Sequence, residues 1–380
     1  MRGMPQQYAS WPHNPGVRVL HLTDRLTDRG GAHRYLLSIT RALAERGHDV
    51  HIAAGAACGL TEEVPATIHE LPGLESRTAR PVALDPLLDR LGPDVLHVHT
   101  VVNPIVLQQA AERGAVFTVQ DHRSFCPARG KWTAKGEVCG VALAPAVCGD
   151  CFDDRAYHDE MMALTQARLL AIQGASLIVL SEYMRGELVR ARLAAERIAV
   201  VPPFVDFGTD AARAEPDGPP CVLFVGRLVE AKGPLDAVAA WRQSGVALPL
   251  VVAGTGPLRD QVEAAGAEVR GWIPHERLPR LLRRARALLM PSRWQEPFGI
   301  AGLEALSLGV PVVAWDSGGI REWHPAPLVA WGDVAGLARA LRAVIGSTAS
   351  PPAGFAPAPL IDRLERVYAA VPAGLVGELS

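Results

Sequence analysis

The stretch Pro291–Glu304 constrains the fold of this chain more than any other part of the sequence. It follows an apolar run, residues 285–290, whose composition predicts a buried strand. Gly299 then opens a helical pattern that ends at Gly309. A strand, a loop and a helix in this order are typical of α/β sheets, in which ligands bind beyond the carboxyl ends of parallel strands. We therefore expect a ligand at this loop.

Two carboxylates lie in this stretch. Glu296 is in the loop, and Glu304 is more than one turn into the predicted helix, so the two can contact different parts of one long ligand. The start of the helix presents free N–H groups and a positive dipole end, which suit a diphosphate. The alternative is a strand–helix unit with two solvated glutamates.

A second loop in the same half carries two cations beside a predicted helix start. The apolar run Cys221–Val225 predicts a parallel strand buried on both faces, and Arg227 and Lys232 follow it between Gly226 and Gly233. Cations are unfavourable at a helix N-terminus unless an anion neutralises them. Arginine can bind two phosphate oxygens at once, and lysine adds a mobile charge. We interpret the pair as a phosphate clamp, with a solvated charged loop as the alternative.

The first half of the chain opens with a predicted β-α-β unit. A strand at 17–22 leads into a loop with Gly30 and Gly31, a helix at 32–46 and a strand at 49–54. Glycines at this position allow the backbone to approach a ligand, although a tight turn alone would also explain them.

Polar residues follow a later predicted strand, 115–119, where an α/β sheet faces its ligand. They include Gln120, Asp121 and His122.

A cysteine-rich segment follows, with the spacing Cys126-x12-Cys139-x8-Cys148-x2-Cys151. It has little apolar periodicity, so something other than a core must order it. Four thiolates, including one Cys-x-x-Cys pair, suit a tetrahedral structural zinc ion. An iron–sulfur cluster, a redox pair and uncoordinated cysteines are the alternatives.

Length and composition bound the remaining choices. The chain has 380 residues, 49% of them hydrophobic, which is ample for two cores. The formal net charge of −2, without a polybasic run, argues against nucleic acid. No apolar run reaches the roughly 18 residues of a membrane-spanning helix, and residues 1–16 lack a signal core. We expect a cytoplasmic protein with reduced or metal-bound cysteines, and at most peripheral membrane contact.

These patterns predict an α/β protein with two Rossmann-like domains. The expected parts, in chain order, are a loose leader at 1–16, an N-terminal domain at 17–208 with a cysteine-rich insertion at 126–151, a linker at 209–220, a C-terminal domain at 221–355 and a last helical segment at 356–380.

The second half also carries a resemblance. Glu296-Pro-Phe-Gly, Glu304 and the strand-like run Gly309-Val-Pro-Val-Val-Ala314 resemble the signature of the family-4 retaining glycosyltransferases of the GT-B fold. The glycine loop at Gly30 and the Arg227–Lys232 pair are similar to other parts of that family.

The resemblance implies an acceptor domain and a nucleotide-sugar donor domain facing each other across a cleft, with the last helix crossing back to the first domain. It also implies roles for particular groups. Arg227, Lys232 and the helix start at Gly299 would stabilise the leaving diphosphate. Glu296 would orient the sugar and Glu304 the ribose. The other implied ligand-binding positions are Gly30, Gly31, Gly226, Gly271, Trp272, Ile273, Phe298, Gly299 and Ile300.

One position departs from the resembled pattern. The family usually reads Thr-x-His-Asp after the strand at 115–119, and here Gln120 stands in the place of that histidine. His122, two residues later, either takes over the contact with the transferred sugar or only forms local hydrogen bonds.

The implied activity is transfer of a sugar from a UDP- or GDP-sugar to a hydroxyl of a glycan, glycolipid or natural product, with retained configuration and without a catalytic metal. The alternatives are a nucleotide-sugar epimerase or hydrolase on the same fold, and a non-catalytic nucleotide-sugar-binding subunit.

Overall fold

The computed structural model describes residues 16–371, except 82, 206, 208–214 and 351. The chain divides into two compact units: residues 1–128, 142–204 and 355–380 form the first, and residues 129–141 and 205–354 form the second. Most of the predicted leader, residues 209–214 of the predicted linker and residues 372–380 lie outside the described residues.

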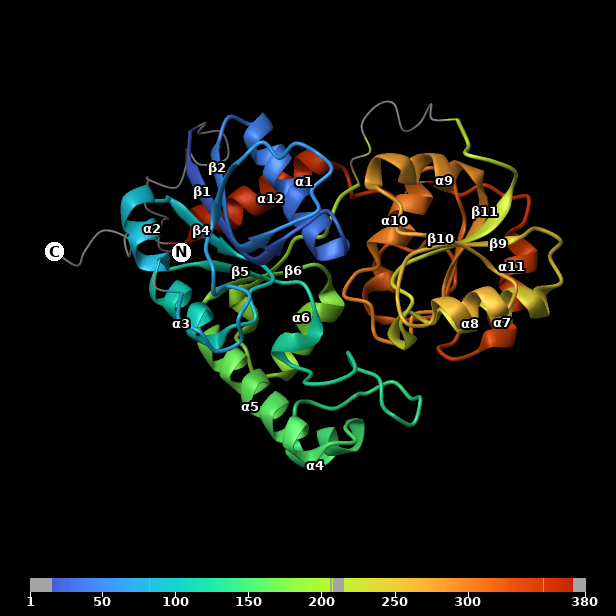
Figure 1. The fold of residues 1–380 in the computed structure, drawn as a ribbon, viewed down its shortest axis with the longest axis horizontal. Helices are drawn as coiled ribbons and strands as arrows, with labels where there is room; N and C mark the ends of the chain where they lie inside the picture. The colour runs from blue at the N-terminus through green and yellow to red at the C-terminus, as the bar shows by residue number, and fades with distance from the viewer. Residues whose placement is uncertain (1–15, 82, 206, 208–214, 351, 372–380) are drawn as a thin grey trace, which may run out of the picture. The chain divides into compact units, whose positions relative to one another are not determined.

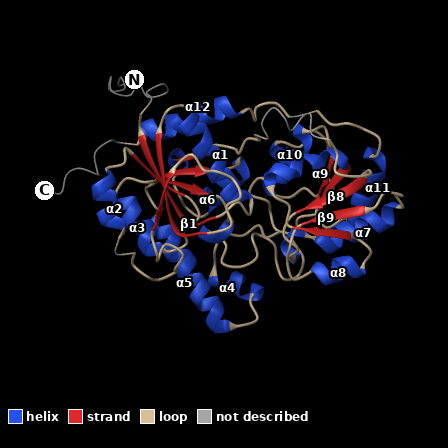
Figure 2. Ribbon diagram, turned by 45° about the horizontal axis from the view of Figure 1, so that its top comes forward, coloured by secondary structure: helices blue, strands red, loops and turns tan. Residues whose placement is uncertain are grey.

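The first unit is built on a parallel sheet of seven strands in the order β3-β2-β1-β4-β5-β6-β7 (Figures 1 and 2). Its strands are β1 (Arg18–Leu26), β2 (Asp49–Ala57), β3 (Thr67–Glu70), β4 (Val95–Val98), β5 (Val116–Val119), β6 (Ser176–Val179) and β7 (Ile198–Val200). Branched apolar residues make up three of the four positions in β4 and in β6, because helices cover both faces of such a sheet. The helices are α1 (Gly31–Glu45), α2 (Leu84–Leu91), α3 (Pro104–Glu112), α4 (Pro145–Cys148), α5 (Arg155–Ala171), α6 (Glu182–Arg190) and α12 (Pro357–Ala370).

The second unit has a parallel sheet of five strands in the order β10-β9-β8-β11-β12. They are β8 (Cys221–Val225), β9 (Leu250–Ala253), β10 (Glu268–Gly271), β11 (Ala285–Met290) and β12 (Val312–Ala314). Five helices accompany them: α7 (Pro234–Ser244), α8 (Arg259–Ala264), α9 (Leu278–Arg284), α10 (Ile300–Ser307) and α11 (Val334–Val344). Leu223, Val252 and Leu289 are fully buried at the centre of this sheet.

Strand order reverses once in each sheet, and this fixes where ligands can bind. In the second sheet the reversal lies between β8 and β11, and in the first between β1 and β4. The connections that leave the sheet in opposite directions at such a point open a crevice at the carboxyl ends of the two strands. The two loops that the sequence singles out, after β8 and after β11, meet at the reversal of the second sheet.

Helix α12 returns the end of the chain to the first unit, where it lies beside α1 (Figure 1). Glu365 on α12 accepts hydrogen bonds from Arg46 at 2.8 Å and is 3.1 Å from the ring of His48. Leu364 and Tyr368 of the same helix are buried. The last helix therefore contributes core to the unit that begins the chain.

Two units with this strand pattern form the α/β fold that the sequence predicts, but their boundaries differ from the predicted ones, most of all in the insertion. The predicted N-terminal domain includes the whole insertion 126–151, whereas residues 129–141 pack with the second unit. Sequence periodicity did not show this because the contacts that hold the segment lie far along the chain.

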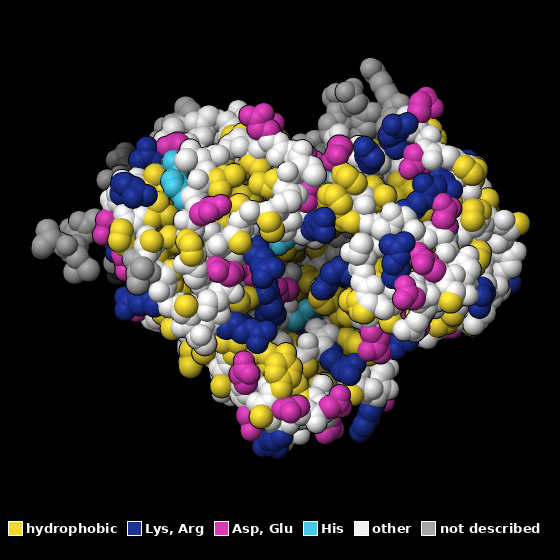
Figure 3. Space-filling model, in the orientation of Figure 1, with side chains coloured by type: hydrophobic (Ala, Val, Ile, Leu, Met, Phe, Trp, Pro, Cys, Tyr) yellow, Lys and Arg dark blue, Asp and Glu magenta, His cyan; other side chains and the backbone are white. Residues whose placement is uncertain are grey.

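The face in Figure 3 carries side chains of both charges on both units. Among the described residues, every helix is too short or too polar to cross a membrane.

Candidate functional site

The loops after β8 and β11 approach each other closely. Gly233, in a left-handed conformation with φ of 65°, ends the first loop, and a Cβ there would lie 2.0 Å from the carbonyl oxygen of Pro291. The backbone N–H groups of Arg293 and Trp294 both donate to the carbonyl of Ala231, at 3.0 and 3.1 Å. Glycine is therefore required at 233 because the backbones touch.

These contacts place Glu296 against Lys232, as the sequence predicts for one binding site. The Lys232 ammonium donates to Glu296 Oε1 at 2.7 Å, and the Ser292 hydroxyl donates to the same oxygen at 2.5 Å. The side chain of Glu296 is only 4% exposed. Burial raises the pKa of Glu296, but the charge of Lys232 and hydrogen bonds from Lys232, Ser292 and Trp294 outweigh it and lower the pKa overall. Glu296 is therefore a carboxylate at neutral pH.

Both cations of the first loop lie over one aromatic ring. The Lys232 Nζ atom is 4.2 Å from the ring centroid of Trp294, and the Arg227 guanidinium carbon is 5.7 Å from it. Arg227 is exposed, and in the part of the chain that the structure describes it forms no ion pair with a carboxylate. Its positive charge remains available to an anion.

The start of α10 is shaped by glycine and tryptophan. Gly299 caps the helix with φ of 89° and without a side-chain hydrogen bond. The carbonyl of Phe298 accepts a hydrogen bond from the Trp323 indole at 2.6 Å. A Cβ on Gly302 would lie 2.1 Å from the Trp323 ring. The N-terminal N–H groups of α10, which include that of Ile300, begin directly after the loop that holds Glu296.

A third loop, after β12, holds the backbone of Glu296. The Gly319 N–H donates to the Glu296 carbonyl at 2.8 Å, and the Gly318 N–H donates to the side-chain oxygen of Gln295 at 3.0 Å. Ser317 accepts from the Glu296 N–H at 3.3 Å and donates to the carbonyl of Trp294 at 2.7 Å. Glu296 is thus fixed at its carboxylate and at its backbone.

Glu304 is buried on α10 and has a partner that the sequence did not indicate. His275 Nε2 lies 3.2 Å from Glu304 Oε1, and the His275 ring stacks on Phe207 at 4.9 Å between centroids. His275 comes two residues after Ile273, so the predicted base-binding segment and Glu304 lie close together. A histidine just beyond that segment could have been considered as a partner of a carboxylate.

The ends of β8, β9 and β10 also converge. The Gly254 N–H donates to the carbonyl of Gly271 at 2.7 Å, and a Cβ on Gly254 would lie 1.8 Å from the carbonyl oxygen of Gly226. Trp272 and Ile273 follow Gly271 and are half-buried. All the donor-side residues that the sequence predicts therefore belong to the same end of one sheet.

The predicted residues of the first half lie at the corresponding end of the other sheet. Gly30 precedes α1 with φ of 93°, a conformation that favours glycine, and both Gly30 and Gly31 are exposed. Asp24, near the end of β1, accepts a hydrogen bond from Thr100, just after β4, at 2.5 Å. This edge is polar, as expected where an α/β sheet meets a ligand.

His122 lies in a short helical turn after β5 and is buried beside aromatic rings. Its ring centroid is 5.5 Å from that of Phe125 and 6.5 Å from that of Tyr183. Gln120 is instead bonded to His99, with 3.1 Å between Nε2 and Nδ1. These ring contacts do not decide between the two alternatives for His122, and its contact with a sugar stays a prediction.

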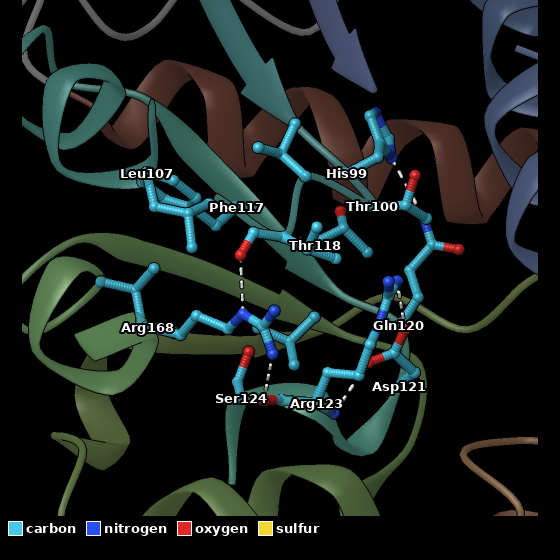
Figure 4. Close-up of a pocket in the computed structure, with 14 residues that line it drawn as sticks. His99, Thr100, Leu107, Phe117, Thr118, Gln120, Asp121, Arg123, Ser124 and Arg168 are labelled. Atoms are coloured by element: carbon cyan, nitrogen blue, oxygen red, sulfur yellow. Dashed lines mark hydrogen bonds and ion pairs between the residues drawn. The ribbon is translucent and has the colours of Figure 1, made fainter. Parts of the chain in front are cut away.

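A small cavity lies next to this turn (Figure 4). Gln120, Asp121, Arg123 and Arg168 are among its lining residues. Its volume of about 30 Å³ holds about two water molecules, so it is too small for a sugar. The buried Arg168 donates to the carbonyl of Val102 at 2.7 Å, and burial, together with the charge of Arg123, lowers the pKa of Arg168 to about 10.

Three histidines form a buried cluster beneath the β1–β4 reversal. One ring nitrogen from each of His21, His97 and His99 lies within 4.8 Å of the other two, a spacing that suits a metal ion. Both ring nitrogens of His97 already form hydrogen bonds, one with Tyr368 at 2.8 Å and one with Thr118 at 2.6 Å. The two ring nitrogens of His99 form hydrogen bonds with His21 and Gln120. Burial lowers all three pKa values, that of His21 to about 3. We interpret the cluster as a neutral hydrogen-bonded layer.

The four cysteines of the insertion are divided between the units. Cys126, Cys148 and Cys151 belong to the first unit and Cys139 to the second, so their mutual distances are not all defined. Among the described residues, only the histidine cluster brings three or more His, Cys, Asp or Glu ligand atoms within 4.8 Å of one another. The sulfur atoms of Cys126, Cys148 and Cys151 therefore do not all lie that close together. The zinc site stays a prediction.

Comparison with known families accounts for both halves of the chain. The profile of the family described as "Glycosyltransferase Family 4" matches residues 29–208, and that of "Glycosyl transferases group 1" matches residues 209–326. The chain belongs to the family-4 glycosyltransferases. Together the two matches include every predicted donor-site residue and all four cysteines.

Individual relatives agree with this assignment. The chain is 32% identical over 226 residues to 2-deoxystreptamine glucosyltransferase of Streptomyces kanamyceticus, covering 52% of this chain and 57% of the relative. It is 28% identical over 365 residues to 2-deoxystreptamine N-acetyl-D-glucosaminyltransferase of Streptomyces fradiae, covering 82% and 81%. The first of these matches thus spans little more than half of the relative's length.

A solved structure shows the same fold. Anabaena HepE, solved in complex with UDP-glucose, superposes with a TM-score of 0.63 at 17% identity and covers 94% of this chain and 96% of its own. The chain has the GT-B fold.

Proposed function

We propose that this glycosyltransferase moves a sugar from a nucleotide-diphosphate donor to a hydroxyl of an acceptor, with retention of anomeric configuration. The observation that supports this most is the arrangement around Glu296. A buried carboxylate is held by Lys232 at 2.7 Å, next to the exposed and unneutralised Arg227 and to the start of α10.

The arrangement suits departure of a diphosphate. Breaking the sugar–phosphate bond increases the negative charge on the leaving group. The cations Arg227 and Lys232 and the N–H groups at the start of α10 would stabilise this negative charge. These groups supply the stabilisation that a metal ion provides in other transferases, so we expect no catalytic metal.

Glu296 and Glu304 suit two other parts of such a donor. An ionised carboxylate only accepts hydrogen bonds, and sugar and ribose hydroxyls donate them. Glu296, beside the cations, would hold the sugar hydroxyls. Glu304, with His275 and the segment after β10, would hold the ribose and lie near the base.

The comparisons support the substrate class at a coarser level. The neighbour of similar fold was solved with UDP-glucose, and two relatives are named for transfer to 2-deoxystreptamine. A UDP- or GDP-sugar and a small hydroxyl-bearing natural product are therefore our first choice of substrates. The polar edge at Asp24 and Thr100 would take the acceptor, in the cytoplasm.

The test is incubation of the full chain with UDP-, GDP- and TDP-sugars, with and without candidate acceptors. Release of nucleotide that depends on an acceptor, with a product of the donor's anomeric configuration by NMR, is the expected result. Release without an acceptor would indicate a hydrolase, and isomerisation of the donor sugar an epimerase. Nucleotide-sugar binding without any reaction would indicate a non-catalytic subunit. Each of these three outcomes contradicts the proposal.

A further inference from the structure

Residues 129–141 belong to the second unit although the chain on both sides of them belongs to the first. They fold as a small hairpin. Trp132 and Val138 form an antiparallel bridge, and the Cys139 N–H donates to the carbonyl of Lys131 at 2.9 Å. The buried Lys131 also donates its ammonium to the carbonyl of Val141, which closes the base of the hairpin.

The hairpin contacts the donor-site loop through its backbone. The Gln295 N–H donates to the carbonyl of Gly130 at 2.9 Å. Gln295 is 4% exposed, and its side-chain oxygen accepts from Gly318 on the opposite side of the loop. The residue immediately before Glu296 is therefore held from two sides, once by the β12 loop and once by the hairpin.

A tryptophan anchors this contact. Trp132 is 4% exposed, and the guanidinium carbons of Arg129 and Arg293 lie 4.9 and 5.9 Å from its ring centroid. Arg293 in turn forms a two-pronged ion pair with Asp236 at 2.7 and 2.9 Å, which fixes it on α7. The Trp132 indole N–H has no hydrogen-bond partner among the described residues, so the ring acts through packing and through its π face.

We infer that the hairpin Arg129–Val141 is a positioning element for Glu296: it holds the loop Arg293–Glu296 so that the carboxylate stays beside Lys232. The inference rests on the proposed role of Glu296 in sugar transfer. An insertion within the first half of the sequence then completes the donor site of the second unit. A misplacement of about 1 Å at a reacting group can cost about 100-fold in rate, so such support has a measurable effect.

The test compares Trp132→Ala with the conservative Trp132→Phe and with the control Lys135→Ala, at an exposed position near the tip of the same hairpin. Two readouts are used on the full chain: amide hydrogen exchange of peptides covering residues 292–297, and steady-state transfer together with the Kd of the nucleoside diphosphate. We expect Trp132→Ala to speed exchange in this loop and to lower kcat by between about 10- and about 100-fold, with Kd within about threefold of wild type.

Trp132→Phe should behave as wild type in both readouts, because the indole N–H has no partner to lose, and Lys135→Ala should change neither. If Trp132→Ala does not fold, Arg129→Met replaces it in the test. This variant removes the cation over the Trp132 ring and the 3.5 Å ion pair with Glu230, so it should change exchange and kcat in the same direction but by less. Unchanged exchange or an unchanged kcat would overturn the inference. So would a fall in kcat that is accompanied by an equally large weakening of nucleotide binding. If wild type transfers no sugar at all, the proposed function fails, whereas the exchange readout still decides whether the hairpin holds the loop.

Discussion

At the scale of single residues, the site depends on a direct contact between opposite charges, Lys232 and Glu296, at 2.7 Å. Glu296 keeps a lowered pKa in spite of burial because Lys232, Ser292 and Trp294 all stabilise its ionised form. Arg227 differs from Lys232 because it is exposed and has no carboxylate partner among the described residues. Under the proposed function, a positive charge in that position would contribute to binding and catalysis rather than to folding.

Replacing Arg227 by alanine should therefore lower kcat by about 10²–10³-fold, the usual cost of removing one group that stabilises developing charge. Stability should change by no more than about 0.5 kcal/mol because the side chain is exposed. Arg286→Ala is the matched control, since Arg286 is also exposed but lies near the amino end of β11, away from the site. Equal transfer rates for both variants and wild type would show that Arg227 is not part of a phosphate clamp.

At the scale of elements, β1, β4 and the residue directly after β4 carry three buried histidines whose pKa values are lowered by burial. Between pH 6.5 and about 3, an unfolded His21 binds a proton that the folded one does not. The free energy of unfolding should therefore fall as pH falls below 6.5, by about 1.4 kcal/mol per pH unit for each such histidine.

Denaturant unfolding at pH 7, 6 and 5 measures this dependence. His21→Gln should reduce its slope below pH 6 by about 1.4 kcal/mol per pH unit, because one titrating group is removed. An identical slope in the variant and wild type would mean that His21 is already protonated in the folded chain.

The sequence predicted those elements whose information is local. The apolar runs that became β8 and β11, and the glycines that open α10 and close the loop before α7, follow from burial and backbone geometry within a few residues. The hairpin at 129–141 was not predicted because its partner, Gln295, lies in the other half of the chain. His275 was missed for the same reason, since its role appears only when α10 brings Glu304 to it.

At the scale of the whole molecule, the chain passes between the two units four times: into and out of the hairpin at 129–141, at residue 205 and at residue 355, before α12. Helix α12 joins the first unit through the Glu365 contacts with Arg46 and His48. The cysteines follow the same pattern, since Cys139 is in the hairpin and the other three are on either side of it in the first unit.

The zinc site at the four cysteines of the insertion stays a prediction, and metal analysis tests it. We expect about one zinc ion per chain in protein purified without chelator, bound by Cys126, Cys139, Cys148 and Cys151, and protection of these thiols from titration. The variant Cys58→Ser, at an exposed cysteine outside the insertion, should keep the metal, whereas Cys139→Ser should lose it. Less than about half an equivalent of zinc or iron, with all four thiols reacting in the native state, would exclude the site.

The proposed function assigns different roles to the two glutamates: Glu296 acts in transfer, whereas Glu304 holds the nucleotide. The most direct measurement is the transfer rate and the nucleoside-diphosphate Kd of Glu296→Gln and Glu304→Gln, side by side on the full chain. We predict that Glu296→Gln lowers kcat by about 100-fold or more with Kd within about threefold, and that Glu304→Gln weakens binding by about tenfold with a smaller change in kcat. The reverse pattern, or an unchanged kcat in Glu296→Gln, would contradict it.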